Sequence, residues 1–107
     1  MDMNNMNILE KIETIKKRLA ELKEELAEIK VEGQDENKTI TAVVSGKGQI
    51  LDYNLNLGQI GALNKETLIK AVVDASNNGL KAAKEIEANK RKEIIGELNL
   101  PDMPGLF

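Results

Sequence analysis

The chain has 107 residues, with 15 basic and 18 acidic side chains, and it contains neither cysteine nor histidine. This composition excludes disulfides, thiol nucleophiles, imidazole catalysis and most zinc sites, so we expect no enzyme activity, no metal and no cofactor. The formal net charge of −3 argues against indiscriminate wrapping of nucleic acid but leaves room for a local basic patch.

The length fits a single domain whose core must come from aliphatic residues, since Tyr53 and Phe107 are the only aromatic ones. The first seven residues, MDMNNMN, lack the basic and apolar regions of a signal peptide. No apolar run approaches the ~20 residues needed to cross a bilayer. We therefore expect a soluble cytoplasmic protein with no membrane partner and no small-molecule substrate.

An apolar residue recurs every three or four positions between residues 4 and 30, which predicts a long, coiled-coil-like first helix. Basic residues dominate the positions beside this stripe, so parallel pairing of two copies would bring like charges together. The helix should instead pack on another element or present its basic edges to a partner. The stripe consists of Ile8, Ile12, Ile15, Leu19, Leu22, Leu26 and Ile29.

Residues 31–57 change to a period of two, which predicts three strands with one apolar face that the helices must cover. The strands are expected at about 31–34, at 39–44 and at 51–57. The sequence SGKG at 45–48 supplies Gly46 and Gly48 for a tight hairpin between the last two strands. It lacks the longer loop and the following helix of a phosphate-binding loop.

A second helix is predicted to begin after Asn64, a suitable N-cap, and to run to about Ile95. The stretch SNNG at 76–79 weakens its middle and allows a bend there, because glycine destabilises a helix by about 1 kcal/mol relative to alanine. Gly96 is expected to stop the helix. The predicted fold is therefore α+β, in the order α-β-β-β-α, with residues 1–97 as one domain.

The final segment, residues 98–107, is an apolar tail that contains both prolines of the chain. The prolines exclude a helix in this segment, and they also exclude a strand in the centre of a sheet. A short apolar tail can dock on its own subunit, on another copy or on a partner, and chain ends also fray. The sequence leaves docking and fraying open.

Two basic clusters are the candidate binding sites, because clustered cations can contact phosphates without reading sequence. The alternative is ordinary solubilising helix surface. The near absence of aromatic residues disfavours recognition of single strands. The candidates for contact with double-stranded DNA are Lys11, Lys16, Lys17, Arg18, Lys23, Lys81, Lys84, Lys90, Arg91 and Lys92.

The whole layout resembles the YbaB/EbfC family of bacterial nucleoid-associated proteins. The resemblance rests on the Met- and Asn-rich start, on the motif V-x-G at 31–33 followed by alternating strands, and on the ending GELNLPDMPGLF. It also rests on the second helix, which is similar to the family pattern L-x-x-A-x-x-D/N-A at Leu68, Ala71, Asp74 and Ala75. The chain differs from the family in the connection LNLGQIGALNKE, which lacks a proline, and at Gly79, where a helix former is usual.

The resemblance implies a homodimer joined through the sheet regions, with helical arms that project like tweezers. It also implies largely non-specific binding to double-stranded DNA and a role in nucleoid organisation or gene regulation. The family offers no DNA-contact motif that transfers to single residues, so the candidates above come from charge position alone. The alternative interpretation is a prefoldin-like co-chaperone or a protein–protein adaptor without DNA binding.

Overall fold

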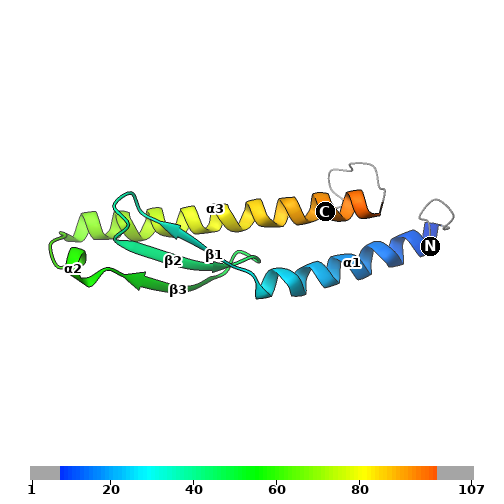
Figure 1. The fold of residues 1–107 in the computed structure, drawn as a ribbon, viewed down its shortest axis with the longest axis horizontal. Coiled ribbons are helices and arrows are strands. Elements are labelled where there is room, and N and C mark those ends of the chain that lie inside the picture. The colour runs from blue at the N-terminus through cyan, green and yellow to red at the C-terminus, as the bar shows by residue number, and fades with distance from the viewer. Residues whose placement is uncertain (1–7, 99–107) are drawn as a thin grey trace.

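The computed structural model describes residues 8–98 and has the predicted order of helix, three strands and helix. The molecule is elongated, about 64 × 22 × 15 Å, with the sheet against the first half of the long last helix (Figure 1). The first helix lies beside the second half of that helix. The elements are α1 (Ile8–Glu28), β1 (Lys30–Gln34), β2 (Ile40–Ser45), β3 (Ile50–Leu55), α2 (Leu57–Ile60) and α3 (Lys65–Glu97).

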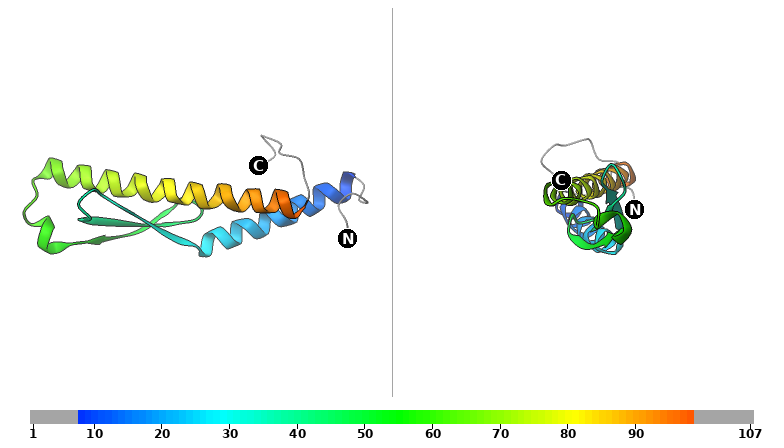
Figure 2. Two further views of the ribbon diagram at one scale, coloured as in Figure 1. Left: turned by 45° about the horizontal axis from the view of Figure 1, so that its top comes forward. Right: turned by 90° about the vertical axis from the view of Figure 1, so that its left-hand side faces the viewer.

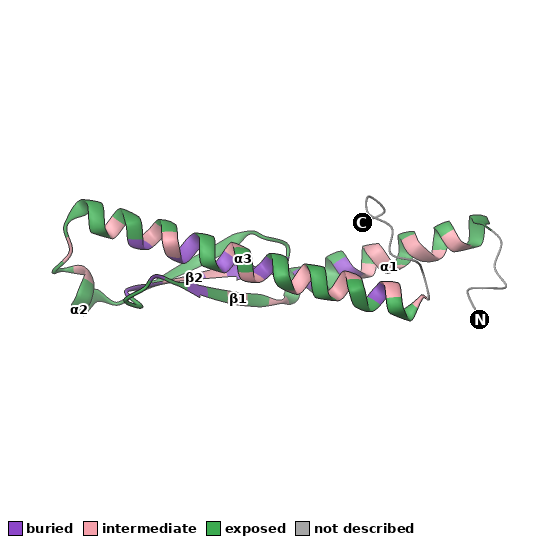
Figure 3. Ribbon diagram, turned by 90° about the horizontal axis from the view of Figure 1, so that it is seen from above, coloured by how far each residue is buried: buried purple, intermediate pink, exposed green. Residues whose placement is uncertain are grey.

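The three strands form an antiparallel sheet in the order β1-β2-β3. The alternation in β2 places Ile40, Ala42 and Val44 on one face, and all three are fully buried under α3. Small residues of α3, among them Ala71 and Ala75, complete this core. Figure 3 shows the buried positions of this core where α3 lies over the sheet. The apolar face predicted for the strands is thus confirmed for β2.

The long helix α3 passes without interruption through residues 76–79, where the sequence allowed a bend. The reason is tertiary, since Gly79 lies directly against Gly33 of β1 and the side chain of Val44. The Asn78 side chain adds a bond from its Nδ2 to the carbonyl oxygen of Gln34, at 2.8 Å. Close packing on the sheet therefore offsets the local weakness of the glycine, and the helix continues through the stretch where the sequence left a bend open.

The ends of α3 agree only in part with the sequence prediction. Asn64 is the N-cap, as predicted, and its Oδ1 accepts a hydrogen bond from the backbone N–H of Thr67 at 2.8 Å. Gly96 does not stop the helix, which continues to Glu97 with Leu98 as the C-cap. The predicted turns of the first helix before residue 8, and the tail at 99–107 with its prolines, lie outside the described residues.

The connection after the sheet differs from the sequence prediction. Leu57 was expected in the third strand, but β3 ends at Leu55 and Leu57 begins the short helix α2. Asn56 caps this helix, because its Oδ1 accepts a bond from the backbone N–H of Gln59 at 3.3 Å. The hairpin between β2 and β3 is as predicted, and Gly48 adopts a φ of +85° that favours glycine.

The apolar stripe of α1 is buried only in its second half. Leu22 and Leu26 pack against Ile94 of α3 and form a second, smaller core. Towards the start of the helix the stripe becomes exposed, with Ile12 at 44% and Ile8 at 74% of their maximal accessible surface. Figures 1 and 2 show the reason, because the first turns of α1 project past the end of α3.

The edge strand β3 lacks the helical cover that the sequence led us to expect, because α3 packs on β1 and β2. Its main tie to α3 is the Tyr53 hydroxyl, which lies 2.6 Å from Oγ of Ser76. That bond places β3 beside the flank of α3 that carries further exposed apolar side chains. We call this apolar surface the β3 shelf, and its residues are Leu51, Tyr53, Leu55, Leu57, Ile69 and Val73.

Candidate nucleic-acid interface

The candidate residues in the first half of α1 lie on its open side. Lys16 and Lys17 are exposed, and Lys11 is partly exposed. Within residues 8–98 no carboxylate lies within ion-pair distance of any of these three amines. They are available to a polyanion, but the structure does not bring them together with the basic residues of α3.

Arg18 differs from its neighbours because it joins α1 to the end of α3. Its guanidinium lies 2.9 Å from Glu97, 2.8 Å from Glu21 and 3.7 Å from Glu25. The hydrogen bond to Glu97 raises the pKa of Arg18 above its usual value, and Glu21 adds to this effect. These three carboxylates neutralise much of the charge of Arg18, and its guanidinium links α1 to the end of α3.

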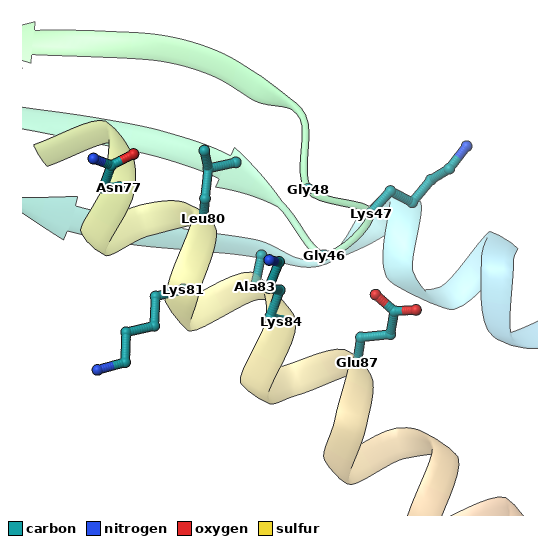
Figure 4. Close-up of a pocket in the computed structure, with 9 residues that line it drawn as sticks. All are labelled: Gly46, Lys47, Gly48, Asn77, Leu80, Lys81, Ala83, Lys84 and Glu87. Carbon is teal, nitrogen blue, oxygen red and sulfur yellow. The ribbon is translucent and has the colours of Figure 1, made fainter. Parts of the chain in front are cut away.

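The β2–β3 hairpin and α3 enclose an open hollow with a basic rim (Figure 4). Lys47 stands at the hairpin tip, while Lys81 and Lys84 project from α3. Glu87 extends from α3 toward the hairpin and is the one carboxylate that lines this hollow. The floor of the hollow consists of the apolar side chains of Leu80 and Ala83 and the backbone of Gly46 and Gly48.

A second hollow adjoins the first one and lies between α1, the hairpin and α3. Lys23 of α1 and Arg91 of α3 line it, and Lys47 lines both hollows. Arg91 forms an ion pair with Glu87, which neutralises part of its charge. The fold thus brings five cations from three elements to one surface, which we call the basic surface: Lys23, Lys47, Lys81, Lys84 and Arg91.

Sequence reasoning did not single out Lys47. The stretch SGKG was interpreted only as a hairpin, and a lysine at a turn is ordinary surface in a sequence. Its significance comes from the topology, which carries the hairpin to the junction of α1 and α3. The signal that could have found it is the lysine between two glycines, at a hairpin tip that has no acidic neighbour.

The remaining two candidates, Lys90 and Lys92, line neither hollow. Lys90 lies 3.9 Å from Glu93, a weak ion pair one turn along the helix. Lys92 is exposed. The candidate residues of α3 are therefore divided, with Lys81, Lys84 and Arg91 on the basic surface and Lys90 and Lys92 outside it.

Two further features, a metal-ligand cluster and a membrane-crossing helix, are absent from residues 8–98. No group of three or more acidic side chains is arranged to hold a metal ion. None of the helices is both long and apolar enough to cross a membrane.

Residues 1–98 match the model of the YbaB/EbfC DNA-binding family. The chain belongs to this family. The match covers all described elements, and it confirms the family that the sequence resembles. YbaB/EbfC proteins are a DNA-binding family and not an enzyme family, and DNA is the partner that membership indicates.

Curated relatives extend over nearly the whole chain. A nucleoid-associated protein of Syntrophobacter fumaroxidans is 29% identical over 103 residues, which cover 94% of each chain. A nucleoid-associated protein of Caldanaerobacter subterraneus subsp. tengcongensis is 29% identical over 104 residues, covering 97% of this chain and 91% of the relative. Both YbaB/EbfC relatives are bacterial and are named nucleoid-associated proteins, in agreement with the family that the sequence resembles.

The fold also occurs in a solved structure. The crystal structure of an uncharacterized protein from Helicobacter pylori superposes with a TM-score of 0.71 at 18% identity. The superposition covers 85% of this chain and 99% of the other one. The α-β-β-β-α fold predicted for this YbaB/EbfC chain is therefore confirmed.

Proposed function

We propose that the protein binds double-stranded DNA as a homodimer, largely without sequence preference, and that it acts in nucleoid organisation or gene regulation. The observation that carries the DNA part is the basic surface. Lys23, Lys47 and Lys84 come from three different elements and converge around two adjoining hollows in a chain of net charge −3. Such a concentration of unpaired cations attracts a phosphate backbone.

The side chains of this surface favour contact with phosphate over reading of bases. Lysine is a point charge on a flexible stem and lacks the planar fork with which arginine recognises guanine. The one arginine there, Arg91, is held by Glu87. No aromatic side chain lines either hollow. Binding that depends on charge and not on sequence is the consequence.

The homodimer is supported by the β3 shelf. Leu55 and Val73 are about half exposed, and Leu57 is 77% exposed, on a single chain. Contiguous apolar surface of this kind marks protein interaction sites. It borders an edge strand whose outer side has no partner strand within residues 8–98. A second copy would cover both features and would double the basic surface.

The proposal is tested by gel shift on a duplex across a salt series. Lys47→Glu together with Lys84→Glu should weaken binding at least tenfold at physiological salt. The slope of log affinity against log salt should fall by about 0.9 for each lost phosphate contact. Binding that is indifferent to salt and to this double variant would contradict the assignment of the surface.

A matched double variant controls for the effect of net charge on DNA binding. Lys30→Glu and Lys65→Glu change the net charge equally, but both lysines are exposed and line neither hollow. We expect this variant to bind DNA within about threefold of the native chain. Equal losses in the two double variants would mean that net charge matters and the basic surface does not.

The alternative of a prefoldin-like adaptor gains no support from the packing of the helices. Such a protein needs two helices paired along matched apolar stripes. Here the apolar contact between α1 and α3 is limited to the cluster of Leu22, Leu26 and Ile94 and its immediate neighbours, while the first half of α3 packs on the sheet. We therefore favour DNA binding over the adaptor interpretation.

A further inference from the structure

The first half of the α1 stripe is an apolar surface that the described residues leave open. Ile8 and Ile12 are 74% and 44% exposed, and Ile15 is half-buried. These three residues lie on one face of the helix and form what we call the distal seam. In the second half of the same stripe, Leu22 and Leu26 are buried against α3. The distal seam differs from this buried half in that no helix covers it, because α3 ends before reaching it.

The chain leaves α3 next to this seam. Glu97, the last residue of α3, is bonded to Arg18 in the middle of α1, at 2.9 Å. Leu98 is half-buried and packs against the cluster of Leu22, Leu26 and Ile94. The described chain therefore ends at Leu98 beside α1, near the point where burial of the stripe stops.

The tail is long enough to cover the distal seam. From Arg18 to Ile8 the helix rises about 15 Å, at about 1.5 Å for each of ten residues. Nine further residues, 99–107, span up to about 30 Å when extended. Pro101 and Pro104 prevent α3 from continuing and favour extended backbone. The segment that follows Leu98 is therefore long enough to reach Ile8, and its two prolines prevent it from extending α3.

The composition of the tail matches the surface beside it. Its apolar residues would supply the contacts that the three isoleucines lack. Asp102 is its one charged residue, and basic side chains flank the distal seam at Lys11 and Lys16. A charge of the opposite sign is therefore available on both sides of the seam. The apolar residues of the tail are Leu100, Met103, Leu106 and Phe107.

We propose that residues 99–107 fold back along α1 of the same chain and cover the distal seam. The tail then continues, on the first half of α1, the apolar contact that α3 makes on the second half. This proposal does not depend on DNA binding or on the homodimer. It assigns a function to the tail that the sequence alone left undecided between docking and fraying.

The natural absence of cysteine makes a direct test possible. The variant Ile12→Cys places one thiol on the distal seam, and Glu13→Cys places one on the open side of the same turn. Reaction of each thiol with a small disulfide reagent is measured in the full chain and after deletion of residues 99–107. Deletion should speed the reaction of Ile12→Cys at least fivefold and leave that of Glu13→Cys unchanged. Equal rates with and without the tail would overturn the proposal, provided that circular dichroism shows helical chains.

A second experiment identifies the chain that supplies the tail. In the double variant Ile12→Cys and Leu106→Cys, mild oxidation should give a disulfide within one chain, at monomer mass on a denaturing gel. The matched pair Glu13→Cys and Leu106→Cys should form its disulfide at least tenfold more slowly. A product of dimer mass would show that the tail crosses to a second copy. Equal rates for both cysteine pairs would show that the tail does not dock on the distal seam. Either result would overturn the proposal as stated.

Discussion

Gly33 of β1 and Gly79 of α3 contact each other backbone to backbone. A β-carbon at Gly33 would lie 2.0 Å from the backbone nitrogen of Gly79, and one at Gly79 would lie 2.7 Å from Cγ2 of Val44. Neither distance is compatible with a side chain. The absence of a side chain at both positions is what lets the long helix lie flat on the sheet.

We predict that Gly79→Ala destabilises the protein although alanine is the better helix former. Overpacking of a buried contact typically costs about 1–3 kcal/mol, which exceeds the gain of about 1 kcal/mol in helix propensity. Gly96→Ala is the control, because Gly96 lies in the same helix with nothing within 4 Å of a new β-carbon. It should stabilise by up to about 1 kcal/mol. Chemical denaturation at one fixed protein concentration measures both, and stabilisation by Gly79→Ala would refute the packing argument.

The carboxylate of Asp35 predicts an acid-sensitive loop between β1 and β2. Burial by itself raises the pKa of Asp35, but hydrogen bonds from the backbone N–H of Ile40, at 2.8 Å, and from Thr39 outweigh it. The pKa of the folded protein is therefore below the usual value. Stability from this group is present above the unfolded pKa of about 4 and is lost as the pH falls through the folded pKa.

Asp35→Asn should retain an acceptor for Ile40 and remove this part of the acid dependence. The difference in free energy of unfolding between native chain and variant should shrink as the pH falls below about 4, as measured by denaturation at a series of pH values. Asp35→Ala leaves a buried N–H without its acceptor and should cost about 1–3 kcal/mol at neutral pH. A constant difference between native chain and Asp35→Asn across the acid range would contradict the argument.

The β3 shelf predicts a substitution that separates two copies without unfolding either one. Leu55→Lys places a charge on the shelf at a residue that is half exposed in the single chain, so the fold should tolerate it. Light scattering should show the mass falling from dimer toward monomer. Asn54→Lys adds the same charge on the opposite face of β3 and should leave the mass unchanged. A dimer that survives Leu55→Lys would mean that the copies meet elsewhere.

The ion pairs of Arg18 predict a modest, salt-sensitive link between the two helices. Arg18 is 24% and Glu97 58% exposed at the side chain, so solvent screens the interaction. A double-mutant cycle with Arg18→Gln and Glu97→Gln should give a coupling energy of about 0.5 kcal/mol that decreases at high salt. Arg18→Gln should also weaken DNA binding less than Lys47→Glu. A larger effect of Arg18→Gln on DNA would place Arg18 on the binding surface after all.

Local patterns were sufficient to predict most of the fold. The helix period, the strand alternation, the hairpin at Gly48 and the cap at Asn64 each depend on neighbours in sequence, and all four are confirmed. Helix α2 was missed because Leu57 continues the strand alternation. Its signal was Asn56, whose cap competes with the strand pattern.

Features that depend on tertiary contact could not be predicted in the same way. Gly79 reduces local helix propensity, and its benefit exists only because Gly33 faces it from another element. Lys47 and Lys84 are 37 positions apart in the numbering of the chain, and only the topology places both at one hollow. Arg18 had the charge of a DNA contact, but its partner Glu97 lies at the far end of the sequence.

The unbroken course of α3 has a mechanical consequence. One helix of 33 residues packs on the sheet in its first half and on α1 in its second half. The same helix therefore connects the sheet core directly to the contact with α1. Helix α1 is connected to β1 through the single residue Ile29, and it is held on α3 by the cluster of Leu22, Leu26 and Ile94 and by the ion pairs of Arg18. The sheet core therefore fixes α3 directly, whereas it fixes α1 mainly through the contacts that α1 makes with α3.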